Sequence, residues 1–171
     1  MGDEVRYWTT VGSAGTLNAA DLAKVSLDNA VITLGRGILP PEASAAEDPS
    51  LGLPEVSAVV RYNVTAVDGL FAPSEPFGYV LELTYRGKVR ARLAQFDRSS
   101  GTETDLLHFD SADFPPVGGF ATNASLAGPP VAVMDFANCA YYVEATLTAS
   151  AIVVGNPAEI AVVRVFASTE L

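Results

Sequence analysis

The sequence is 171 residues long, a length that suits one domain, spanning 1–171, with a hydrophobic core of its own. It carries 20 acidic and 10 basic residues, for a net charge of −10. This acidity argues against nucleic acid or an anionic membrane as the main partner. The single cysteine, Cys139, excludes an intrachain disulfide. Because no signal peptide and no apolar run of about 18 residues is present, we expect a cytoplasmic protein, with release in a particle left open.

The first part of the chain predicts a strand, a short helix and a small hairpin. The strand covers Glu4 to Val11, and Asn18 is a good N-cap for a helix near 18–24 that has Asp21 in its first turn. Alternating apolar residues on both sides of Asp28-Asn29 then predict a hairpin over 25–34. The Pro-rich stretch 35–54 cannot be a central strand, so it is either a solvated loop or an arm that lies on a neighbouring subunit.

Two further segments predict strands that are half buried. Alternation from Glu55 to Val67 gives one apolar face, and Tyr79 to Tyr85 followed by Val89 to Phe96 predicts a second hairpin. A three-residue loop would pair Leu83 with Ala91 and set Glu82 beside Arg92. Basic residues gather here, so we consider a solvated face, a subunit contact or an anion site at this basic patch, which consists of Arg86, Lys88, Arg90 and Arg92.

The next stretch offers weak chemical signals. Glu103 to Asp110 predicts a strand in which His108 is a structural residue, and Cys139 further on is a buried thiol rather than a nucleophile. The long loop 110–130 is dense in Pro and Gly, and Val131 to Phe136 predicts another short strand. Three acidic residues leave calcium binding open, although turn chemistry explains them equally well; they are Asp105, Asp110 and Asp113.

The stretch from Ala140 to Phe166 predicts a long β-hairpin with its turn at 155–158. Pairing Val154 with Glu159 leaves both faces mainly apolar, which suggests cover on both sides. One cover would be the second sheet and the other a second subunit. The outer face predicts an interface of five residues, namely Ile152, Val154, Ala161, Val163 and Val165.

Together these elements predict an all-β antiparallel sandwich of 8–10 strands. A jelly-roll or Greek-key topology is the first choice, and a closed barrel is the second. The mean hydropathy of +0.27 is high for a small monomer, although abundant Ala and Val also raise it. No motif in the sequence assigns a catalytic, cofactor or metal site. The fold class does not assign a function either, because a fold of this class serves many functions.

Three function classes remain. The leading hypothesis is a non-enzymatic structural protein that self-associates through the C-terminal hairpin and the loop arms. The alternative is a module that binds carbohydrate or another small ligand on exposed aromatic platforms, for which the candidates are Trp8, Tyr62, Tyr79, Tyr141 and Tyr142. A hydrolase-like enzyme that uses Glu82 or Glu144 as acid or base is the third.

Overall fold

The chain folds as an all-β sandwich of two antiparallel sheets, which confirms the predicted fold class. The computed structural model describes residues 7–35, 55–66, 78–127, 133–150 and 157–168. The Pro-rich segment 36–54 therefore lies outside the described residues, and so does the predicted turn at residues 155 and 156.

Sheet A has six strands in the order β3–β4–β11–β6–β9, with β1 also paired to β11. β6 pairs along one side of β11, so β1 and β4 share the other side. There Trp8 lies opposite Val165, and Ile32 lies opposite Ile160. The strands are β1 (Trp8–Val11), β3 (Val25–Asp28), β4 (Val31–Leu34), β6 (Gly78–Arg86), β9 (Ala121–Ala127) and β11 (Glu159–Ser168).

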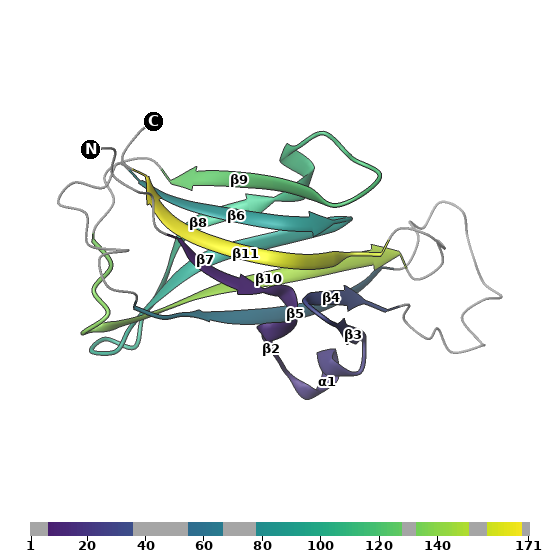
Figure 1. The fold of residues 1–171 in the computed structure, drawn as a ribbon. Coiled ribbons are helices and arrows are strands. Elements are labelled where there is room, and N and C mark those ends of the chain that lie inside the picture. The colour runs from purple at the N-terminus through teal and green to yellow at the C-terminus, as the bar shows by residue number, and fades with distance from the viewer. Residues whose placement is uncertain (1–6, 36–54, 67–77, 128–132, 151–156, 169–171) are drawn as a thin grey trace, which may run out of the picture.

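Sheet B has five strands in the order β2–β5–β10–β7–β8. They are β2 (Thr16–Leu17), β5 (Glu55–Val64), β7 (Lys88–Asp97), β8 (Glu103–Asp110) and β10 (Cys139–Ser150). The helical turns are η1 (Gly12–Ala14), α1 (Ala19–Leu22) and η3 (Ser111–Asp113). Figure 1 shows α1 beside β5 at one side of the molecule and β9 at the opposite side.

The core lies between the two sheets and uses one face of each strand. Alternate residues point inward, as a strand with one buried face requires. Sheet A and sheet B both contribute side chains with no exposed surface, among them Leu81, Leu83, Val163 and Val165 from sheet A and Val89, Leu93, Val143 and Leu147 from sheet B.

The predicted N-terminal elements are confirmed where they are described. The Asn18 side chain accepts a hydrogen bond of 2.8 Å from the Asp21 backbone N–H and so caps α1. The small hairpin joins β3 to β4, and Asn29 in its turn has a positive φ of 52°. None of the described helices is long and apolar enough to cross a membrane.

Both long hairpins are predicted wrongly, for one physical reason. β6 pairs with β11 and β9, whereas β7 pairs with β10 and β8, so the short turn at Gly87 carries the chain from one sheet to the other. Leu83 and Ala91 do share the core, but they point at it from opposite sheets. The alternation of apolar residues therefore predicts correctly which residues of these strands point inward, but it does not show which sheet each strand joins.

The Ala140 to Phe166 segment also divides between the sheets. β10 belongs to sheet B and β11 to sheet A, so no hairpin forms between them. A register shift between Ile160 and Val162 then changes which residues of β11 point inward. As a result, Val163 and Val165 lie in the chain's own core.

The loop 110–130 contains a strand that the sequence does not predict. β9 covers seven of its residues and pairs along its length with β6. Conversely, the predicted strand over Val131 to Phe136 is wrong for its described part, because Val133 to Phe136 form no strand.

Candidate functional site

The four residues of the basic patch are divided between two sheets. Arg86 ends β6 in sheet A, whereas Lys88, Arg90 and Arg92 alternate along β7 and project from the outer face of sheet B. Each cation has a carboxylate partner, at 2.6 Å for Arg86–Glu159, 2.9 Å for Lys88–Glu55, 2.7 Å for Arg90–Asp110 and 2.6 Å for Arg92–Asp105. The patch is thus neutralised rather than a free positive surface.

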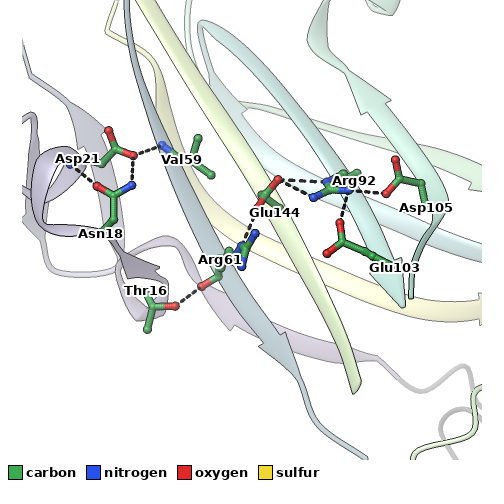
Figure 2. A network of polar contacts seen from close by, with 9 residues as sticks. All are labelled: Thr16, Asn18, Asp21, Val59, Arg61, Arg92, Glu103, Asp105 and Glu144. Atoms are coloured by element: carbon green, nitrogen blue, oxygen red, sulfur yellow. Dashed lines mark hydrogen bonds and ion pairs between the residues drawn. The ribbon is translucent and has the colours of Figure 1, made fainter. Parts of the chain in front are cut away.

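Arg92 is the centre of a charged network on the outer face of sheet B, shown in Figure 2. Its guanidinium contacts Glu144 at 2.9 Å, Glu103 at 2.7 Å and Asp105 at 2.6 Å. Glu144 also accepts a hydrogen bond of 2.6 Å from Arg61. These contacts follow from register, because Glu144 on β10 is directly opposite Arg61 on β5 and Arg92 on β7. We call these five residues the Arg92 network.

Several members of the Arg92 network, and Tyr142 beside it, have shifted pKa values. The neighbouring Tyr142 hydroxyl and the Arg92 guanidinium lower the pKa of Glu103. A hydrogen bond to Glu144 raises the pKa of Arg61. Burial, and then the neighbouring Glu103, raise the pKa of Tyr142 to about 12. These groups keep one protonation state at neutral pH, whereas a general acid or base needs a pKa near the working pH.

The predicted acid–base carboxylates lie on different sheets. Glu144 is held between two arginines on sheet B, and Glu82 on sheet A is bound by Arg164 at 3.0 Å. The expected pairing of Glu82 with Arg92 is therefore wrong. Two carboxylates that lie on opposite sheets and are each bound by arginine do not form the facing pair that glycoside hydrolysis requires.

Two of the three residues considered for metal binding, Asp105 and Asp110, have other partners, and no such partner is found for Asp113 among the residues that the structure describes. Asp105 binds Arg92, and Asp110 binds Arg90 and accepts a hydrogen bond from the Ala112 N–H at the start of η3. His108 is exposed, with its Nε2 3.6 Å from Asp105. Within the described part of the chain, no three His, Cys, Asp or Glu side chains are grouped so as to hold a metal ion.

The aromatic residues proposed as ligand platforms are buried, four of them in the core and Tyr142 beneath Arg61 on the outer face of sheet B. The exposed fraction is 9% for Tyr142 and smaller for the other four, which are Trp8, Tyr62, Tyr79 and Tyr141. Burial raises the pKa of Tyr62, whose hydroxyl donates a hydrogen bond of 2.9 Å to the Gly12 carbonyl. Cys139 is buried as well, and its Sγ accepts a hydrogen bond from Gln95. None of these side chains offers a platform or an accessible nucleophile.

Two of the hollows on the described surface are lined by residues of the basic patch. One, of about 360 Å³, lies over β7 and β8 and is lined by the paired residues Arg90 and Asp110. The other, of about 560 Å³, lies at the end of the sandwich beside Gly87, between the wall Phe114 to Gly119 and the paired residues Lys88 and Glu55. The cations in both hollows already have carboxylate partners, so neither hollow presents an unpaired positive charge to a ligand.

The outer face of sheet A carries an apolar row instead of a charged network. Phe166, Val80 and Leu126 are directly opposite one another on β11, β6 and β9. Tyr7 packs edge-on against Phe166, with ring centroids 4.7 Å apart. Tyr7 is 48% exposed and Leu126 is 43% exposed, so the two ends of the row are open to solvent. We call these four residues the outer apolar row.

The edges of the sheets differ in how they are protected. An unpaired edge presents backbone N–H and C=O groups that invite another strand. Beside β5, side chains from β2, from α1 and from the turn after it bind these groups. Asp21 accepts from the Val59 N–H, Thr16 donates to the Arg61 carbonyl and Lys24 donates to the Ser57 carbonyl. Figure 2 shows the first two of these contacts.

The other edge strands are short or charged, with one exception. β3 has four residues and contains Asp28, and β8 contains Glu103, Asp105 and Asp110. β9 has seven residues, ATNASLA, with no charge and no proline. Among the described residues, only β6 pairs with it. We call its other side the β9 edge.

The predicted interface residues do not lie together on a surface. Val163 and Val165 have no exposed surface, so their assignment to an interface is wrong. Ala161 is partly buried, and Ile152 and Val154 lie outside the described residues. The sequence does not predict β9 as a strand, because Ala, Asn and Ser are poor strand formers. The only available signal was the weak alternation of Thr122, Ala124 and Leu126.

Comparisons with known proteins give no assignment for these surfaces. No protein-family model matches the sequence. Searches of curated proteins and of solved structures find no significant similarity either. Function must therefore be argued from the geometry of this chain alone.

Proposed function

We propose that this protein is a non-enzymatic structural protein that self-associates into a homo-oligomer through the β9 edge of sheet A. The observation that carries the proposal is the β9 edge, an uncharged seven-residue sheet edge on a chain with a net charge of −10. Natural sandwiches usually protect such edges with charge, proline or cover, because an open edge pairs with other chains.

The rest of the described surface supports this choice by contrast. The edge of β5 is bound by side chains, and the exposed strand β8 is acidic. The outer apolar row reaches the β9 edge at Leu126. Contact at this edge would thus remove apolar surface from water in addition to forming backbone hydrogen bonds.

The other two function classes have less support. The five aromatic candidates for ligand stacking are buried. The two candidate carboxylates, Glu82 and Glu144, are bound by arginine on opposite sheets. We therefore do not propose ligand binding or hydrolysis as the main role.

Sedimentation equilibrium over a range of concentrations tests the proposal. We expect a molar mass above the 17.8 kDa of one chain, rising with concentration. Because every copy is strongly acidic, added salt should screen repulsion and strengthen association, since the Debye length falls from about 10 Å at 0.1 M to about 3 Å at 1 M. A mass of one chain at every concentration and salt level would refute the proposal.

A further inference from the structure

From the β9 edge we infer a specific partner and geometry: two copies of this chain pair β9 with β9 in antiparallel fashion, about a two-fold axis at Ala124. This inference rests on the proposed self-association and adds how it occurs. Sheet A would then continue from one copy into the next.

Backbone direction restricts the register of this pairing. In a strand, the N–H and C=O of one residue point to the same side, and those of the next residue point to the other side. Only alternate residues of β9 therefore present groups to the free side. Two residues directly opposite one another either both belong to that set or both lie outside it, so their numbers are both even or both odd. The sum of paired numbers is then even, and the two-fold axis passes through a residue position, not between two residues.

The length of β9 selects one position for the axis. Centring on Ala124 pairs the whole of residues 121–127 with its copy, whereas moving the axis by one residue pairs only 121–125 or 123–127. In the centred register, Thr122 on the outer face lies beside Leu126 of the second copy. The paired residues lie on the same face, so both sandwiches lie on one side of the continuous sheet.

Charge favours a second copy as the partner of this strand. Identical strands that pair bring identical charges together, and like charges in opposition destabilise a sheet. Self-pairing of β8 would place Glu103, Asp105 and Asp110 of both copies along one seam. β9 itself has no charge to oppose, although the acidic strand β8 of sheet B packs beside it. Because antiparallel self-pairing uses the same edge of both copies, the contact closes at a dimer and does not propagate.

Disulfide cross-linking reads the register directly. We would place single cysteines at Ala124 or Thr122 in a Cys139→Ser background and follow dimer formation under mild oxidation on non-reducing gels. At the axis the two Cα atoms would be about 4.5–5.5 Å apart, within the roughly 4.4–6.8 Å that a disulfide spans. The two copies of position 122 would be roughly 14 Å apart, from a rise of about 3.4 Å per residue.

The expected result is a several-fold faster cross-link for Ala124→Cys than for Thr122→Cys. Ala20→Cys, an exposed site on α1, reports random collision. If Cys139→Ser does not fold, the same variants in the native background serve, because Cys139 is buried and the parent protein provides the blank. A protein that is dimeric by sedimentation but shows no preference for position 124 would overturn the edge pairing and leave self-association standing. A monomer would overturn both.

Discussion

The contacts of Asp21 beside β5 provide a quantitative test of how side chains protect the edge of this strand. Asp21 is only 7% exposed. Its Oδ2 accepts hydrogen bonds from the Val59 N–H at 3.2 Å and from Asn18 Nδ2 at 2.9 Å, and its Oδ1 is 2.7 Å from Lys24 Nζ. The substitution Asp21→Asn keeps the shape of the side chain but removes its charge and one of its two acceptor oxygens.

We expect Asp21→Asn to lower the free energy of unfolding by about 2–3 kcal/mol. Hydrogen bonds to charged groups contribute about 1.5–3 kcal/mol, and a buried donor left without an acceptor adds to the loss. Urea unfolding at pH 7, followed by the fluorescence of the single tryptophan Trp8, measures the difference. Asp28→Asn makes the same charge change at an exposed position and should stay within about 0.5 kcal/mol of the parent protein.

The effect of Asp21→Asn should depend on pH in a defined direction. The hydrogen bond from Lys24, helped by the Val59 N–H, lowers the pKa of Asp21 below its ordinary value of 3.8 even though burial opposes this. The stability that the carboxylate contributes is therefore complete above the unfolded pKa and is lost as the pH falls through the lower folded pKa. A difference between parent and variant that is absent at pH 7, or that does not shrink on acidification toward pH 3, would refute this account of the edge.

Two further substitutions test the fold itself. Gly87→Ala should lower the free energy of unfolding by about 2–3 kcal/mol, because φ is +78° and the added Cβ would lie 2.5 Å from the Pro157 carbonyl oxygen. Gly101→Ala is the control, because φ is +69° but nothing lies within 4 Å of the added Cβ, and it should cost only about 1 kcal/mol. Equal costs in urea unfolding would contradict the contact between position 87 and Pro157. Val163→Glu should prevent folding, because burying the charged side chain should lower the free energy of unfolding by more than about 4 kcal/mol. If circular dichroism shows a folded variant that no longer associates, Val163 would belong to an interface and not to the core.

Alternation in the sequence predicts the faces of most strands but not their partners. Leu81, Leu83 and Val89 are inward-facing as expected. These side chains would face the same core whether the two strands formed a hairpin within one sheet or were joined by a turn between two sheets. The alternation of apolar residues therefore cannot distinguish a hairpin from a turn between sheets. The choice depends on contacts that are distant in sequence, such as that between Arg92 and Glu144, and these cannot be read from local spacing.

The candidate site shows a similar limit. The sequence locates the cations of the basic patch but not their partners, because Glu159 and Glu55 are far from Arg86 and Lys88 in the chain. The β9 edge is missed because its residues are small, polar and flanked by Pro- and Gly-rich segments. A feature that is defined by which described strands pair with β9 emerges only once the strand order is known.

The most direct test of pairing at the β9 edge measures molar mass by light scattering. It compares three proteins at the same concentration, namely the parent protein, Ala124→Lys and Ala20→Lys. Both variants reduce the net charge of −10 by one unit, and both positions are exposed. If copies pair at the β9 edge, Ala124→Lys opposes two ammonium groups at the axis and should shift the protein toward monomer, whereas Ala20→Lys should leave association unchanged or slightly stronger. The same molar mass for both variants and the parent would contradict pairing at β9.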